Sequence, residues 1–271
     1  MAVRESVLVS EPNATAVMTE IVDAVATFGT VSLDQLDQAQ LHDRVERKVL
    51  LRVAEVPAVL EQLRADYFVM QHLGDYLQGY TTCYLDDDDL HDYRDHHNRK
   101  RNRKKIRYRT YDNSSMTFFE VKRKFGGRTV KERQATEPIE RTMRDDDAEF
   151  LEERTDVAAE ELQPVMTVHY ERLLLVKKDY TERVTIDVDL RFESPDRTMV
   201  APALAVCEIK QPRVDRTSPA VRLLGRRTQQ FSKYCVGMAA CEPTLKQNRF
   251  KKVFRMLDKL DARPIRLEPA Q

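Results

Sequence analysis

One stretch, residues 105–133, constrains the fold more than any other part of the sequence. It alternates charged with apolar or uncharged residues over 105–111, 116–125 and 128–134, and a period of two is typical of β-strands. The segments 112–115 and 126–127 between them have turn compositions, the second being a Gly-Gly pair suited to a two-residue hairpin loop. The stretch therefore predicts a three-stranded antiparallel meander.

The lengths of these turns fix the register of the meander. We expect Glu120 opposite both Arg107 and Arg133, and Lys122 opposite both Lys105 and Lys131. One sheet face then carries a single acid, Glu120, and seven cations: Lys105, Arg107, Arg109, Lys122, Lys124, Lys131 and Arg133. The other face is mainly apolar, with Ile106, Tyr108, Phe119, Val121, Phe125 and Val130 beside Arg123, Arg128 and Glu132.

Like charges placed directly opposite one another destabilise a sheet, so this concentration of cations needs an explanation. One interpretation is an outer face in contact with solvent, with the apolar face turned to the core. The other is a wet, cationic concavity that holds a polyanion.

Composition excludes several classes of protein. The chain has 271 residues, enough for one large domain or two small ones, and its formal net charge is +0, so only the distribution of charge can indicate a partner. No apolar run approaches the ~18–20 residues of a membrane span, and no leader sequence is evident. The four cysteines have no metal-ligand spacing, which favours a reduced, cytoplasmic setting. No Walker A or Gly-rich dinucleotide motif is present.

The rest of the chain predicts further strands and a few helices around a single domain. We expect a loose lead-in over 1–31, one domain over 32–262 and a tail over 263–271. Ser32 begins a helix as its N-cap, with Gln35 completing a capping box. Strands are expected at 44–50, 68–70, 80–85, 165–177, 181–192 and 203–210, and helices at 56–67, 145–162, from 218 to about 238, and near 250–257.

Two features invite a metal or nucleic-acid interpretation that we do not favour. The four acids at 86–89 point in different directions, so a solvated turn or a helix start is the better interpretation. His91 and His96 do not share a helical face, which disfavours zinc. The basic run 98–104 is interpreted as an exposed loop that leads into a cationic strand, because the cations of several strands converge on one face.

An ordered series of charged motifs runs along the predicted strands. Its members are Glu46-x-Lys48, Lys105-Ile-Arg107-Tyr-Arg109, Phe119-Glu120-x-Lys122, Lys131-x-Arg133, Tyr170-x-Arg172, Arg183-x-Thr-Ile-Asp187, Glu208-x-Lys210 and Phe231-Ser-Lys233-Tyr. Over roughly residues 32–240 the series resembles the VTC domain, the catalytic domain of the vacuolar transporter chaperone complex and its bacterial relatives. These proteins belong to the triphosphate tunnel metalloenzymes.

The resemblance implies an α+β fold in which an eight-stranded antiparallel β-barrel encloses a cationic tunnel. It also implies synthesis of inorganic polyphosphate from ATP, with polyphosphate or pyrophosphate as partner and Mn²⁺ or Mg²⁺ as cofactor. By position, Glu208 would hold the metal, and Glu46, Glu120 and Asp187 would support the site. The candidate catalytic residues are Arg107, Arg109, Lys122 and Lys233, and the phosphate-binding residues are Lys48, Lys131, Arg133, Arg172 and Arg183, with Lys105, Lys124 and Lys210 added from strand parity.

The chain also departs from related patterns. Arg44 stands where the triphosphatase and CYTH-type branches have the first Glu of Glu-x-Glu-x-Lys, which argues against hydrolysis. The transmembrane part and SPX domain of the eukaryotic complex are not in this sequence. Two alternatives stay open: a tripolyphosphatase or nucleoside triphosphatase of the same fold, and a non-catalytic polyphosphate-binding module. Nucleic acid is not an expected partner.

Overall fold

The computed structural model describes residues 14–37, 45–126, 128–139, 142–225, 228–259 and 268–269. Thirteen strands within these ranges form one sheet, whose main path is β12-β2-β11-β9-β8-β4-β5-β6-β7. Every pairing is antiparallel except that of β1 with β3. The strands are β1 (Thr30–Val31), β2 (Val45–Arg52), β3 (Tyr67–Met70), β4 (Leu77–Asp86), β5 (Arg103–Tyr111), β6 (Met116–Phe125), β7 (Arg128–Thr136), β8 (Gln163–Lys177), β9 (Arg183–Glu193), β10 (Arg197–Ala201), β11 (Leu204–Gln211), β12 (Thr228–Gln229) and β13 (Glu268–Pro269).

The sheet curls until its two ends approach each other. A side chain of β6, Lys122, lies 3.8 Å from Glu46 of β2, on the strand next to the opposite end of the path. Within the described ranges, β7 forms no ladder with β2 or β12, so the barrel has an open seam. The expected α+β fold, an antiparallel barrel with external helices, is thus confirmed, but the barrel is not strictly closed and more than eight strands take part.

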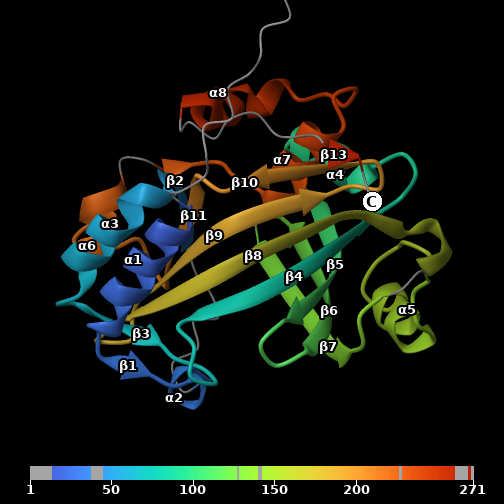
Figure 1. Ribbon diagram of the computed structural model, residues 1–271. Helices are drawn as coiled ribbons and strands as arrows, with labels where there is room; N and C mark the ends of the chain where they lie inside the picture. The colour runs from blue at the N-terminus through green and yellow to red at the C-terminus, as the bar shows by residue number, and fades with distance from the viewer. Residues whose placement is uncertain are drawn as a thin grey trace, which may run out of the picture.

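Helices cover the outer face and one end of this barrel (Figure 1). On the outer face, α1 (Ala14–Ala26), α3 (Val56–Leu63) and α6 (Pro219–Leu224) pack in a row, and α5 (Asp145–Glu152) covers the β5–β6 side. At one end stand α4 (His91–His97), α7 (Lys233–Cys241) and α8 (Lys251–Lys259), while α2 (Leu33–Asp37) packs near β1 and β3. Short 3₁₀ turns occupy Val53–Glu55, Ala159–Glu161 and Asn248–Phe250.

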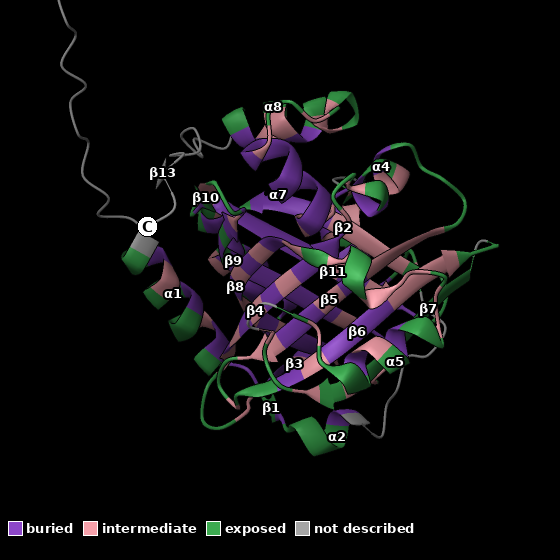
Figure 2. Ribbon diagram, turned by 90° about the vertical axis from the view of Figure 1, so that its right-hand side faces the viewer, coloured by how far each residue is buried: buried purple, intermediate pink, exposed green. Residues whose placement is uncertain are grey.

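The apolar core is divided between the two faces of the sheet. Outside, Val49, Leu51 and Ile186 pack against α1, α3 and α6. Inside, Leu50, Phe192 and their neighbours pack against α7, which is buried from Tyr234 to Cys241 (Figure 2). Because α7 fills only one end of the interior with apolar side chains, the rest of the inner face is left to polar residues.

The predicted register of the meander is confirmed. Arg107 and Arg133 are the Cα partners of Glu120, and Lys105 and Lys131 are those of Lys122. The apolar face of the meander packs on α5 through Ile106, Tyr108, Phe119 and Val121, whereas Phe125 and Val130 of the same face are exposed. The loop residue Gly127 and the strand residue Arg44 lie outside the described residues.

Three other expectations are wrong in part. Residues 14–26 form α1, whose Val17, Ile21 and Val25 are buried, so this part of the expected loose lead-in belongs to the fold. The helix expected from residue 218 to about 238 is interrupted by β12 and becomes α6 and α7. The surface helix expected over 145–162 ends at Glu152. The capping box of Ser32 and Gln35 is present.

Candidate functional site

Charged side chains from seven elements share the inner face of the barrel. Cross-strand pairs place Lys48 beside Glu208, Arg172 beside Asp187 and Arg107 beside Glu120. Because strand side chains alternate, the residues two positions away from these lie on the same face. The strands are β2, β5, β6, β8, β9 and β11, and α7 adds Lys233 from its first turn. The inner surface predicted from the sequence therefore exists.

The first cluster surrounds Glu120, whose side chain is 0% exposed. The Arg107 guanidinium binds its carboxylate with Nε at 2.7 Å and Nη2 at 2.6 Å, and Lys131 donates to its other oxygen. Arg109 lies 3.9 Å away. Burial alone would raise the pKa of Glu120, but these cations overcome it and hold the pKa well below its usual range.

The second cluster surrounds Asp187 on β9, which is 2% exposed. Arg172 grips it in a two-point contact, with Nη2 at 2.9 Å from Oδ2, and Lys233 also donates to Oδ2. Ser232 caps α7 by accepting a hydrogen bond from Cys235 N–H, and this cap sets the direction in which Lys233 leaves the helix. As with Glu120, the neighbouring cations outweigh burial and lower the pKa of Asp187.

The third cluster is centred on Glu208, between Lys48 at 3.8 Å and Lys210 at 3.5 Å. Burial opposes its charge, but the two lysines lower its pKa well below the usual range. Conversely, Glu208 and Glu46 raise the pKa of Lys48 in spite of burial. Glu46 also approaches Lys122 across the seam, so this cluster connects the two ends of the sheet.

Tyrosines that the sequence analysis did not assign to the site connect the first two clusters. The Tyr80 ring centroid lies 5.6 Å from the Arg109 guanidinium and 4.9 Å from that of Arg172. Tyr170 lies under Lys233, 4.4 Å from its Nζ, and its buried hydroxyl has no hydrogen-bond partner in the part of the chain that the structure covers. Tyr84 accepts a hydrogen bond from Arg107 at 3.2 Å.

The pKa values of two of these tyrosines show how strong the positive field is. Burial alone would raise the pKa of both Tyr84 and Tyr170. The nearby guanidinium and ammonium groups instead lower both values, Arg107 having the largest such effect on Tyr84 and Arg109 on Tyr170. A field that favours an anionic phenolate would equally favour the oxygens of a phosphate chain.

A cavity of about 660 Å³ opens at the end of the barrel near α4 and β12. Its inner wall includes Lys48, Lys105 and Lys122. Burial, together with Lys48 and Arg107, lowers the pKa of Lys105 to about 8, and its Nζ donates to Ser232 Oγ at 2.7 Å. The cavity therefore connects the inner lysines with the outside.

Some predicted residues are placed differently from expectation. Arg133 lies on the exposed edge strand β7, 4.4 Å from the Phe118 ring centroid, and Glu120 pairs with Arg107 and Lys131 although Arg133 is opposite it in the ladder. Asp187 pairs with Arg172 and Lys233. Arg183 instead donates to Leu36 O at 2.7 Å, at the end of the inner face near α2.

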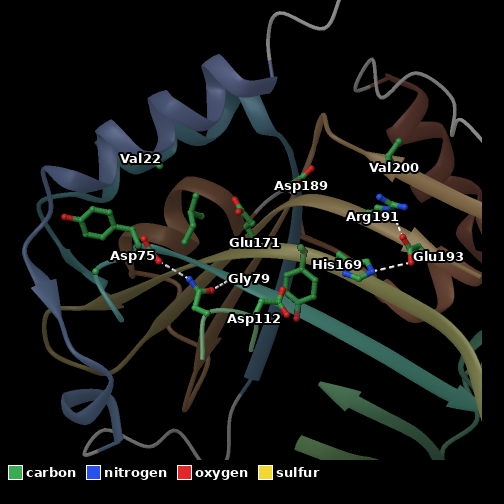
Figure 3. A pocket seen from close by; sticks show the side chains of 15 residues that line it. Val22, Asp75, Gly79, Asp112, His169, Glu171, Asp189, Arg191, Glu193 and Val200 are labelled. Atoms are coloured by element: carbon green, nitrogen blue, oxygen red, sulfur yellow. Dashed lines mark hydrogen bonds and ion pairs between the residues drawn. The ribbon is translucent and has the colours of Figure 1, made fainter. Parts of the chain in front are cut away.

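A larger groove, of about 1160 Å³, lies on the outer face and is unsuited to phosphate (Figure 3). Its side chains include Asp75, Asp112, Glu171, Asp189 and Glu193. Burial, and then the negative charges of Asp189 and Asp75, raise the pKa of Glu171. The outer groove is the larger of the two cavities, but its acidic side chains would repel phosphate, so the cationic inner face is the better candidate for a phosphate site.

The acidic run 86–89 precedes a helix start, as expected, but its first residue is buried and not solvated. Asp86 is 1% exposed and accepts hydrogen bonds from the N–H groups of Asp92 and Tyr93 and from the hydroxyl of Tyr234. It therefore fixes the start of α4 and fastens that helix to α7. His96 lies in the wall of the cationic cavity, where burial and then Lys105 lower its pKa to about 2, so it is neutral.

The sequence model of the VTC domain matches residues 43–242. The chain belongs to the VTC domain family. The matched range includes all three charged clusters described above, so the charged inner face lies within the VTC domain. No curated protein matches the chain.

Solved structures give more distant likenesses to this VTC domain. A candidate adenylate cyclase from Vibrio parahaemolyticus shares 14% identity, with a TM-score of 0.44 over 73% of this chain and 99% of its own. One from Bacillus halodurans shares 12%, with a TM-score of 0.42 over 77% and 97%. A candidate adenylyl cyclase from Hippeastrum, described as having a dominant triphosphatase activity, shares 12%, with a TM-score of 0.42 over 72% and 95%. At this distance they carry no inference about activity.

The carboxylates of the inner face fit a divalent cation only together with a substrate. No group of three or more potential metal ligands is found among the described residues. Glu208 and its neighbour Glu46 are the candidate protein ligands. Mg²⁺ commonly takes one or two carboxylates plus phosphate oxygens, so phosphates would have to supply further ligands here.

Proposed function

We propose that this VTC domain is a metal-dependent polyphosphate polymerase that transfers the γ-phosphoryl group of ATP to a growing inorganic polyphosphate chain. The observation that carries the proposal is the convergence of cations from several strands around three carboxylates on the inner face, of which Glu120 and Asp187 are buried and Glu208 is half-buried. Such a surface suits a linear polyanion, because each phosphate group can replace a carboxylate as the partner of two or more cations.

In the proposed reaction, an oxygen of the terminal phosphate of the chain attacks the γ-phosphorus of ATP. The bond from that phosphorus to the β–γ bridging oxygen breaks, ADP leaves, and the chain gains one phosphate. Arg107, Arg109, Lys122 and Lys233 would hold the transferring group and neutralise charge on its oxygens. No protein nucleophile is needed, because positioning and electrostatic stabilisation supply the rate.

The remaining inner cations would bind the rest of the two substrates. Lys48, Lys105, Lys131, Arg172 and Lys210 line the path on either side of the transferring group. The unpartnered Tyr170 hydroxyl would donate to a phosphate oxygen. A Mn²⁺ or Mg²⁺ ion held by Glu208 would add positive charge to the phosphate oxygens when it is bound.

The test is to incubate the purified protein with ATP and Mn²⁺ or Mg²⁺ and to separate the products by gel electrophoresis. Long-chain polyphosphate together with ADP supports the proposal. Free phosphate alone would indicate the triphosphatase alternative, and tight polyphosphate binding without ADP release would indicate a non-catalytic module. Arg107→Ala should abolish synthesis. Arg123→Ala is the matched control, because Arg123 pairs with Glu132 on the outer face of the same meander.

A further inference from the structure

We propose that four cations at the mouth of the cationic cavity form an outer binding track for inorganic polyphosphate, beyond the residues that hold the reacting phosphates. We call these residues the collar: Arg99, Arg103, Lys124 and Arg249. All four line the same cavity of about 660 Å³. The proposal deepens the proposed function and rests on it for the identity of the polymer.

The collar is assembled from segments that are far apart in the sequence. Arg99 follows α4 and Arg103 begins β5; both belong to the basic run 98–104, and the proposed reaction assigns neither a role. Lys124 is the Cα partner of Arg103 across the β5–β6 ladder. Arg249 belongs to the 3₁₀ turn before α8. Three separate segments therefore bring positive charge to one opening.

Charge compensation differs between the collar and the interior. Inside, Arg107, Arg172 and Lys233 are each paired with a buried carboxylate. No ion pair to a carboxylate is found for any of the four collar residues within the described ranges. Arg99 donates to Gln230 at 2.8 Å and Arg103 to Lys100 O at 2.7 Å, and both of these acceptors are neutral. The collar therefore holds four positive charges that an external anion can compensate.

The collar continues directly into the inner face. Lys48, Lys105 and Lys122 line the deeper part of the same cavity, so an anion in contact with the collar can extend to these lysines without leaving it. A polymer of linked phosphates can span both parts at once. We expect tripolyphosphate bound among the inner clusters to contact fewer of the collar residues than a longer chain does.

The aromatic side chains of the cavity argue against a nucleoside or a single-stranded nucleic acid as the occupant. Phe231 is 6% exposed, and the Phe250 ring already packs against Tyr93 and His97. Bases bind such surfaces by stacking on aromatic faces, which these rings do not present freely. Cations without a stacking surface match a chain that consists of phosphate alone.

The test compares the binding of long-chain polyphosphate, tripolyphosphate and ATP by calorimetry. The collar variant is Arg99→Asn with Arg249→Gln; asparagine is chosen because residue 99 has a φ of 56°, which asparagine tolerates well. The matched control is Arg213→Gln with Arg216→Gln, which removes the same charge from two exposed arginines that do not line the cationic cavity. Thermal unfolding checks that all the variants fold.

We expect the collar variant to bind long-chain polyphosphate about five- to tenfold more weakly, because exposed charge pairs contribute up to about 1 kcal/mol each. The slope of log affinity against log salt should fall by about one to two units. Affinity for tripolyphosphate and ATP should stay within about twofold of the wild type, and the control variant should match the wild type throughout.

Three results would refute the proposed role of the collar: an unchanged affinity for long-chain polyphosphate, an equal loss of affinity for tripolyphosphate, or a loss of affinity for ATP. The last would assign the mouth to the nucleotide. The electrophoretic assay separates this failure from that of the proposed function. A protein that makes polymer but shows no length-dependent loss refutes the collar alone. A protein that makes none but shows the loss keeps the collar as a binding track and refutes the polymerase.

Discussion

Replacing Glu120 by glutamine tests whether the inner carboxylates hold the cations in place. Glu120 is 0% exposed and compensates the half-buried Arg107 and the more exposed Lys131, so the variant leaves both cations without their counter-charge. Removing one partner of a buried ion pair costs about 3–5 kcal/mol. Because the Lys131 side chain is 33% exposed, water can reach part of the cluster, and we expect a loss near about 3 kcal/mol.

For a domain of this size, each 1 kcal/mol lowers the melting temperature by roughly 2–4 °C, so Glu120→Gln should melt about 6–12 °C lower. The matched control is Glu132→Gln. Glu132 also binds two arginines, Arg123 and Arg154, but on the outer face, where its side chain is 34% exposed. Each pair of that kind contributes about 0–1 kcal/mol, so the two together contribute at most about 2 kcal/mol, and the control should melt less than about 8 °C lower and less far below the wild type than Glu120→Gln.

The same variant should bind polyphosphate more tightly, because no carboxylate has to be displaced from the cations. Added tripolyphosphate should therefore raise the melting temperature of Glu120→Gln by more than that of the wild type, through the ordinary linkage of binding and stability. The assay is thermal unfolding with and without tripolyphosphate. Equal destabilisation of both variants, or weaker phosphate binding by Glu120→Gln, would refute the idea of a carboxylate-held anion site.

Three further predictions concern pH and packing. Raising the pH from about 7 to about 9 should weaken polyphosphate binding as Lys105, with a pKa of about 8, loses its proton, and calorimetry of Lys105→Arg should show a flatter profile. Glu120 and Asp187 have lower pKa values in the folded than in the unfolded protein, so the stability they contribute is complete above about pH 5 and is lost as the pH falls through the folded values. Between pH 5 and pH 3, the free energy of unfolding measured in urea should therefore fall less for Glu120→Gln than for the wild type. In Gly237→Ala, the new Cβ would lie 2.7 Å from Phe192 Cδ1, and urea unfolding should show a loss of about 1–3 kcal/mol.

The sequence predicted the meander well because short turns leave little freedom in register. Once Phe125 is set opposite Arg128, every further pair of β6 and β7 follows, and each agrees with the structure. Ion-pair partners could not be predicted in the same way. Long side chains can reach diagonally across a ladder, so Glu120 pairs with Lys131. Asp187 pairs with Arg172 of another strand and Lys233 of α7, and no local sequence pattern connects these residues to it.

Because of one residue in β9, the alternation of side chains along the strand does not predict correctly which of them face inward. Asp189 has a φ of 48°, and the ladder with β8 shifts register beside it. Beyond this bulge the alternation reverses, so Leu190 and Phe192 turn inward, whereas Val184 and Ile186 face the outer core. The sequence 181–192 alternates without interruption, so nothing in it announces the reversal.

Two omissions could have been avoided. Val17, Ile21 and Val25 recur at four-residue spacing, which is a helical pattern, yet the segment was expected to be a loose lead-in. Tyr80, Thr82 and Tyr84 alternate along β4 and share its inner face, so strand parity already places both rings beside the cations of β5 and β8. Aromatic residues at the inward positions of β4 could therefore have predicted that tyrosines take part in the charged inner face.

The three inner carboxylates explain how so many cations can lie close together on one face. Cations kept together without counter-charge would repel one another, and this repulsion would destabilise the folded protein when no phosphate is bound. Glu120, Asp187 and Glu208 each hold two or more cations at fixed positions, and the low pKa values keep all three carboxylates charged. A phosphate chain can then exchange with the carboxylates one cluster at a time. Under the proposed function, each exchange would replace one anionic partner by another, so the cations would keep their positions while a polymer advanced along the inner face.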